Sequence, residues 1–141
     1  MSDKQKTIKN EVSVSGVGLH TGEKVTLTFK PAPDNHGYKF QRIDLEGKPI
    51  INADVDNVVD TSRGTTLEQN GARVYTTEHA LAAVYGLGID NILIELDGKE
   101  IPIMDGSSRY FVEALLKAET VEQTEEKNYY VVTENLAFED V

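Results

Sequence analysis

The residues of this chain that could most directly do chemistry are an adjacent Glu78 and His79, within YTTEHALAAVYGLG at residues 75–88. Thr76 or Thr77 can cap a helix at this point, and two glycines can end it. An acid in the first turn of a helix is common, because it complements the helix dipole by about 0.3–1 kcal/mol. The ordinary interpretation of the pair is therefore a helix cap beside a bystander histidine.

The same pair also suits half of a metal-dependent hydrolytic site. A helix N-terminus favours neutral imidazole, which is the form that binds metals. Adjacent positions on a helix point about 100° apart, so two such side chains cannot ligate one ion in the middle of a helix. At a helix end that faces a cleft, however, His79 can bind the metal while Glu78 acts as general base on the attacking water.

A catalytic zinc site usually has three protein ligands and one open position. The histidines of this chain, His20, His36 and His79, do not show the HxH, HxxxH or HExxH spacing of paired ligands. The chain has no cysteine, which excludes disulfides, cysteine nucleophiles and cysteine-ligated metals. The other ligands of His79 therefore lie outside this chain, or the three histidines together close a site.

A glycine-rich segment, GVGLHTG at residues 16–22, has more glycine than a hairpin turn requires. It is either a flexible hairpin loop or a loop whose backbone approaches a ligand, with His20 at its tip. It does not match the phosphate-binding pattern GxxxxGK[ST]. Further along, MDGSS lacks a G-x-S-x-G nucleophile elbow, so Asp105 and Ser107 are expected to cap a second helix.

Hydrophobic periodicity predicts the elements that must position these segments. The expected strands cover residues 11–15, 23–30, 38–43, parts of 49–58, the arms of an Asn70-Gly71 hairpin within 64–76, and 91–96. Helices are expected from Thr76 or Thr77 to Gly86 and over about 107–118. Their expected buried faces are Leu81, Val84 and Tyr85 on the first, and Phe111, Leu115 and Ala118, joined by Tyr110 and Ala114, on the second. This order predicts an α+β two-layer sandwich, a mostly antiparallel sheet with two helices on one face.

The 141 residues carry 14 basic and 24 acidic side chains, for a net charge of −10. This excess of acid argues against nonspecific nucleic-acid binding and against attraction to anionic membranes. No apolar run approaches the roughly 20 residues that span a bilayer. The polar start, MSDKQKTIKN, contains no signal-peptide core, so we expect a cytoplasmic protein.

The polar, acidic stretch ETVEQTEEK at residues 119–127 is expected to be a linker. After it, NYYVVTENLAFEDV begins a strand pattern that has no partner strand in the chain. We therefore expect a first domain at residues 1–122, followed at residues 123–141 by a linker and the first strand or two of a truncated second domain.

Five blocks, GVGLHTG, DTSRGTTL, TTEHALAA, GLGIDN and EIPIMDGSS, follow one another in the order and spacing of a known family. From about residue 6 to its end, the chain resembles the UDP-3-O-acyl-N-acetylglucosamine deacetylases, which are zinc enzymes of bacterial lipid A biosynthesis. Its sequence also looks like that of Bacteroidetes-type members, in which the deacetylase is fused to a 3-hydroxyacyl-carrier-protein dehydratase.

The resemblance implies an active site between two similar domains. Zinc would be held by His79 from the first domain and by a histidine and an aspartate of a HKxxD motif in the second. Glu78 would be the general base that activates water. Leu19 and His20 would line the mouth of the site and bind the substrate, UDP-3-O-acyl-N-acetylglucosamine, and the loop DTSRGT at residues 60–65 would border it.

Because the second domain lies outside this chain, the resemblance implies a folded but inactive piece that docks on that missing domain. The alternative is a non-catalytic α+β binding or scaffold domain. A HKxxD motif downstream of Val141 would favour the enzyme over this alternative.

Overall fold

The computed structural model describes residues 4–62 and 64–127. Thirteen elements follow one another along this part of the chain: β1 (Lys4–Ile8), β2 (Val12–Val17), β3 (Lys24–Pro31), β4 (Tyr38–Arg42), β5 (Ile50–Asn52), the 3-10 turn η1 (Val55–Asn57), β6 (Val58–Asp60), β7 (Thr66–Gln69), β8 (Ala72–Val74), α1 (Glu78–Gly86), β9 (Ile92–Leu96), α2 (Arg109–Ala118) and β10 (Thr120–Glu126).

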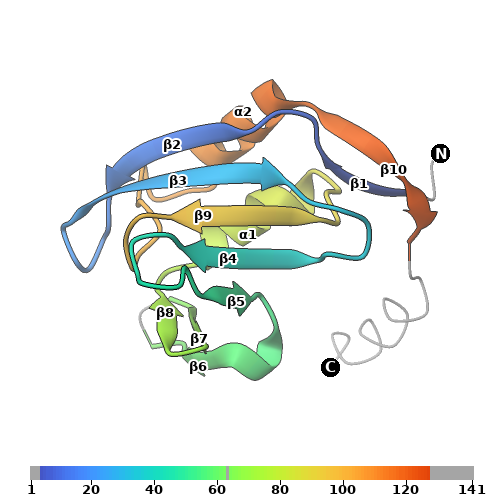
Figure 1. The fold of residues 1–141 in the computed structure, drawn as a ribbon. Helices are drawn as coiled ribbons and strands as arrows, with labels where there is room; N and C mark the ends of the chain where they lie inside the picture. The colour runs from blue at the N-terminus through green and yellow to red at the C-terminus, as the bar shows by residue number, and fades with distance from the viewer. Residues whose placement is uncertain (1–3, 63, 128–141) are drawn as a thin grey trace, which may run out of the picture.

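The main layer is a five-stranded sheet in the order β2-β3-β9-β4-β5. Its neighbouring strands are antiparallel except β4 and β9, which are parallel. Both helices lie behind this sheet in the view of Figure 1, so they form a second layer on one face. Smaller sheets, β1-β10 and β6-β7-β8, complete the fold. The predicted α+β architecture is therefore confirmed.

The core lies between the sheet and the helices, as the alternation along β3 predicts. Leu27 and Phe29 are fully buried, while Thr26 and Thr28, which alternate with them, point to the open face. The Phe29 ring meets Phe111 of α2 edge to face, with centroids 6.3 Å apart. Burying a side chain of this size stabilises a fold by about 1.5–3 kcal/mol, so this contact fastens α2 to the sheet.

The buried face of α1 differs from the prediction. Val84 is buried as expected, but Leu81 is half-buried and Tyr85 is 78% exposed. Ala80 and Ala83 take their place in the core. Small residues let a helix lie close to its neighbours, one of which is α2. In α2 the predicted face is buried, except Tyr110, which is 41% exposed.

Both helices begin where predicted, but with different capping chemistry. Thr77 is the N-cap of α1, yet its hydroxyl donates to the Thr65 carbonyl oxygen at 3.2 Å instead of accepting from a helix amide. The N-cap of α2 is Ser108, which makes no side-chain cap hydrogen bond, and the Ser107 hydroxyl before it accepts from the Arg109 amide at 3.2 Å. Asp105 accepts from the amide and hydroxyl of Ser107, so it orders the preceding turn.

The stretch at residues 119–127 was expected to be a linker, and this is wrong. It contains β10, which pairs antiparallel with β1, a strand that the polar N-terminal sequence did not predict. Side-chain amides hold the two strands on the core, since the buried Asn91 donates through Nδ2 to Gln5 Oε1 at 2.8 Å and to Gln123 Oε1 at 2.7 Å. Because polar side chains make these contacts, the two strands show no alternation of apolar residues from which they could be predicted.

Strand β10 runs through residue 122, where the first domain was expected to end. The division into two domains stays a prediction, and the strand expected after residue 127 lies outside the described residues. Within residues 4–62 and 64–127, neither helix is long and apolar enough to cross a membrane.

Candidate active site

The carboxylate of Glu78, the first residue of α1, is held by the loop before β7. Its Oε1 accepts a hydrogen bond from the Thr65 amide at 2.9 Å. Gly64 lies beside it with a φ of +91°, and a Cβ at this position would stand only 2.8 Å from Glu78 Oε2. Glycine is therefore favoured here for two reasons: it adopts the left-handed backbone without strain, and it leaves room for the carboxylate to approach. Gly64 and Thr65, at the end of the DTSRGT segment, therefore border Glu78.

His79 occupies the next position of α1 and is half-buried. Among the residues that the structure describes, its imidazole makes no hydrogen bond, so both ring nitrogens remain available for a ligand. The same part of the chain contains no group of three or more His, Asp or Glu side chains that could hold a metal ion. A site closed by His20, His36 and His79 is therefore wrong.

The glycine-rich segment after β2 forms a compact turn. The Gly18 amide donates to the Glu23 carbonyl oxygen and the Gly22 amide to the Gly18 carbonyl oxygen, both at 3.0 Å. Leu19, at its tip, is 56% exposed, and the neighbouring His20 is exposed as well. The turn thus presents at the surface both residues expected to bind substrate.

Sequence reasoning missed Glu100, which lies against this turn and is only 2% exposed. Its carboxylate accepts hydrogen bonds from the His20 and Thr21 amides and from the Thr76 hydroxyl. Burial raises the pKa of Glu100, but these hydrogen bonds outweigh burial and hold the pKa below its ordinary value. The available signal was an acid directly before the buried dipeptide Ile101-Pro102, since charged residues are rarely fully buried without partners.

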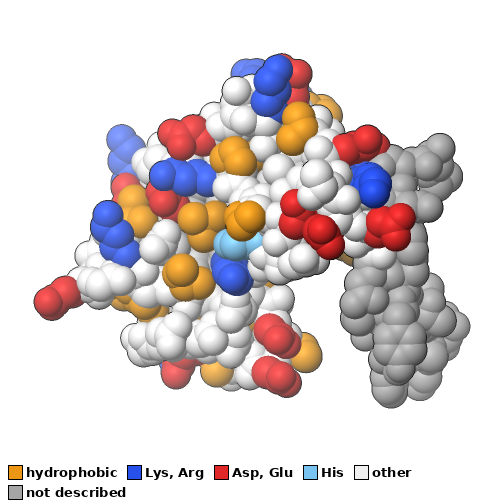
Figure 2. Space-filling view, turned by 45° about the vertical axis from the view of Figure 1, so that its right-hand side comes forward, with side chains coloured by type: hydrophobic (Ala, Val, Ile, Leu, Met, Phe, Trp, Pro, Cys, Tyr) orange, Lys and Arg blue, Asp and Glu red, His pale blue; other side chains and the backbone are white. Residues whose placement is uncertain are grey.

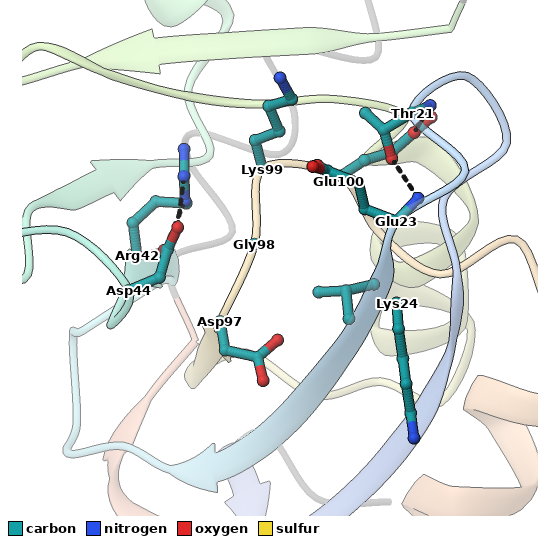
Figure 3. Close-up of a pocket in the computed structure, with 10 residues that line it drawn as sticks. Thr21, Glu23, Lys24, Arg42, Asp44, Asp97, Gly98, Lys99 and Glu100 are labelled. Atoms are coloured by element: carbon teal, nitrogen blue, oxygen red, sulfur yellow. Dashed lines mark hydrogen bonds and ion pairs between the residues drawn. The ribbon is translucent and has the colours of Figure 1, made fainter.

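Beside Glu100 lies a polar cavity of about 330 Å³, drawn in Figure 3. Arg42 and Asp44 line it, joined by two hydrogen bonds of 2.9 and 2.7 Å. The Arg42 hydrogen bonds hold the pKa of Asp44 below its ordinary value. Neither Glu78 nor His79 lines this cavity, so the predicted catalytic pair lies elsewhere.

The surface in Figure 2 mixes acidic, basic and hydrophobic side chains, with hydrophobic ones gathered around a histidine near the middle of the view. A second, apolar groove of about 460 Å³ lies between the end of β2 and the start of α2. Its lining consists of Ser15, Gly16, Val17, Ile103, Met104, Asp105 and Tyr110.

Comparison with known protein families identifies the family of this chain. The family model described as LpxC, UDP-3-O-acyl N-acetylglycosamine deacetylase, matches residues 5–141. The chain belongs to this deacetylase family. The resemblance carried by the five sequence blocks is thereby confirmed.

Relatives of two kinds match the chain. A bifunctional enzyme LpxC/FabZ of Bacteroides thetaiotaomicron is 55% identical over 137 residues, which are 97% of this chain and 30% of that relative. One of Chlorobaculum tepidum is 55% identical over 134 residues, covering 95% of this chain and 29% of the relative. A UDP-3-O-acyl-N-acetylglucosamine deacetylase of Xanthomonas axonopodis is 45% identical over 136 residues, 96% of this chain and 45% of the relative. The chain thus spans less than half the length of these deacetylase relatives.

Proposed function

We propose that this chain is the first domain of a zinc-dependent deacetylase that hydrolyses the acetamide of UDP-3-O-acyl-N-acetylglucosamine in lipid A biosynthesis. The observation that carries the proposal is the Glu78-His79 pair at the start of α1, with the Glu78 carboxylate fixed by the Thr65 amide. Membership in the deacetylase family supports it. The similarity to bifunctional relatives supports a dehydratase domain in the same longer protein.

The described residues suit one part of a zinc site. His79 offers an imidazole without an internal hydrogen bond at the end of a helix, which is suitable donor chemistry for zinc. No further ligands gather around it within the described part of the chain, so the set must be completed by other residues. Zinc, when bound, would polarise the amide carbonyl and ease deprotonation of water.

The geometry of Glu78 suits a general base. The Thr65 amide binds Oε1, and Oε2 accepts no hydrogen bond from the described residues, which leaves it to take the proton of the attacking water. The carboxylate is thus held in one orientation before substrate arrives. Pre-positioning of this kind removes part of the entropic barrier to reaction.

In this proposal Leu19 and His20 contact the substrate at the mouth of the site. Their exposure on a hydrogen-bonded turn supports the assignment. Such a turn already holds its backbone in one conformation, so substrate binding does not have to supply the free energy of ordering it. The cytoplasmic location expected from the polar N-terminal sequence stays a prediction.

The helix layer supports docking of a second domain of the same longer protein. Tyr85 and Leu116 on the two helices are 78% and 61% exposed, and Tyr110 borders the apolar groove beside β2. Exposed large apolar side chains on both helices suit a surface that another domain covers. The missing zinc ligands would then arrive from the side of the helices.

The test uses the full-length protein and its zinc content. We expect His79→Ala to lower bound zinc well below one per chain and to abolish deacetylation, because one of the ligands is lost. His36→Ala is the matched control, since the His36 Nδ1 lies 3.0 Å from the Gly37 carbonyl oxygen in a loop and has no role in the proposed site. Unchanged zinc content in His79→Ala would refute the ligand assignment.

A further inference from the structure

Glu100 connects two segments that lie far apart in the sequence, the turn at residues 18–22 and the start of α1. Its Oε1 accepts from the His20 amide at 3.0 Å and from the Thr21 amide at 2.9 Å. Its Oε2 accepts from the Thr76 hydroxyl at 2.8 Å and lies 3.2 Å from the His20 amide. Figure 3 shows Glu100 beside Thr21 at the base of the turn.

The surroundings of Glu100 are shaped around its carboxylate. A Cβ on Gly18 would stand 2.3 Å from Glu100 Oε1, so this glycine leaves the space that the carboxylate fills. Thr76 has a φ of +62°, an unfavourable conformation for a β-branched residue, and its hydroxyl is bound to Glu100. A backbone bridge pairs Tyr75 with Glu100 and fixes the acid next to the start of α1.

The partners of Glu100 distinguish it from an ordinary buried ion. Within residues 4–62 and 64–127 it forms no ion pair, and its hydrogen bonds come from the His20 and Thr21 backbone amides and from the hydroxyls of Thr21 and Thr76. On one side these donors belong to the turn that carries Leu19 and His20. On the other side the donor, Thr76, precedes Glu78 by two positions. One carboxylate therefore contacts both the turn and the residues that lead into α1.

We propose that Glu100 is a positioning residue for the deacetylase, one that holds the substrate-binding turn in register with the base and the metal ligand on α1. This inference rests on the proposed function. Glu100 acts through His20 and Thr21 on one side and through Thr76 on the other, without touching substrate. Loss of its carboxylate leaves both halves folded but lets them move independently.

The experiment compares variants of the full-length enzyme with UDP-3-O-acyl-N-acetylglucosamine as substrate. Glu100→Ala removes both connections and should lower kcat/KM about 10- to 100-fold, the effect expected when reacting groups are misplaced by about 1 Å. Glu100→Gln should restore kcat/KM to within about threefold, because its amide oxygen accepts from the backbone and its NH2 group donates to the Thr76 hydroxyl. Zinc content should stay unchanged in both.

Variants of Thr76 measure how much of the loss in activity comes from the connection to α1 alone. Thr76→Val removes only the hydroxyl that links Glu100 to α1, so kcat should fall with little change in KM, and Thr76→Ser should restore it. Glu100→Ala should change both constants, because it also releases the turn. The control is Glu95→Ala, which removes a carboxylate that pairs with Lys30 at 3.1 Å on the open face of the sheet and should leave both constants unchanged.

The outcomes separate this inference from the proposed function. If Glu78→Gln is inactive while Glu100→Ala stays within twofold of wild type, the positioning role is wrong and the proposed function stands. If Glu78→Gln remains active, the proposed function itself fails, and the positioning role fails with it. If Glu100→Ala does not fold, the kcat of Thr76→Val decides, and an unchanged kcat there overturns the proposal.

Discussion

Gly64 offers a sharp test of how the Glu78 carboxylate is held. Gly64→Ala places a methyl group 2.8 Å from Glu78 Oε2, well inside the roughly 3.5 Å at which carbon atoms make favourable contacts. The carboxylate is the end of a flexible side chain, so it should move by about 0.5 Å or more at small cost in energy. Its orientation toward water, however, would be lost. We expect kcat of the full-length enzyme to fall about 10- to 100-fold.

The same substitution also strains the backbone, since alanine must adopt the φ of +91° found at Gly64. This strain should lower the free energy of unfolding by about 1–3 kcal/mol, which urea denaturation measures. Gly71→Ala is the matched control, because Gly71 has a φ of +77° and no atom stands within 4 Å of its added Cβ. It should lose similar stability and keep its kcat. Equal kcat in the two variants would refute the claim that Gly64 shapes the orientation of Glu78.

Asn91→Ala should lower the free energy of unfolding by about 1–3 kcal/mol in urea denaturation, because it removes the hydrogen bonds of the buried Asn91 amide with Gln5, Gln123 and the Gly37 amide. Wild type should be more stable than Glu100→Gln above pH 4.5, and this difference should shrink as pH falls further, because the folded state favours the ionised Glu100 carboxylate and so lowers its pKa. Thermal unfolding at several pH values measures the difference. A difference that does not change with pH would contradict this expectation. The 141-residue chain should bind an apolar dye through its helix layer, and Leu116→Glu should reduce the fluorescence; a chain that binds no dye would argue against a covered surface.

Patterns dictated by local backbone chemistry were predictable from the sequence. The Asn70-Gly71 turn joins β7 and β8 as expected, and Asn70 has the positive φ of 55° that such a turn needs. The alternation of β3 correctly identified Leu27 and Phe29 as core residues. These features depend on neighbours in the sequence, so a single chain reveals them.

Features that depend on distant partners were not predictable. β10 looked like a linker because amide side chains, including Gln123, attach it to the core, and these leave no apolar period. Tyr85 was expected inside, but the small Ala80 and Ala83 occupy that position. The contacts of Glu100 could not be predicted, because its donors come from segments about 80 and 24 residues away.

The candidate site was predictable only in part. The adjacent Glu78 and His79 at a helix start could be predicted as a candidate catalytic pair, and the order of five sequence blocks predicted the family. The structure then added the Thr65 amide that holds Glu78 and the left-handed Gly64 beside it, neither of which has a sequence pattern of its own. The roles of Leu19 and His20 in substrate binding stay predictions.

The central claim is that Glu78 is the general base of a zinc-dependent deacetylase, and the turnover of full-length Glu78→Gln tests it most directly. Glutamine keeps the shape of the side chain and can still accept from the Thr65 amide, but it cannot take a proton. We predict that kcat falls about 10²- to 10⁴-fold while zinc content stays at the wild-type level. A zinc-loaded Glu78→Gln enzyme that turns over within a few-fold of wild type would contradict the account.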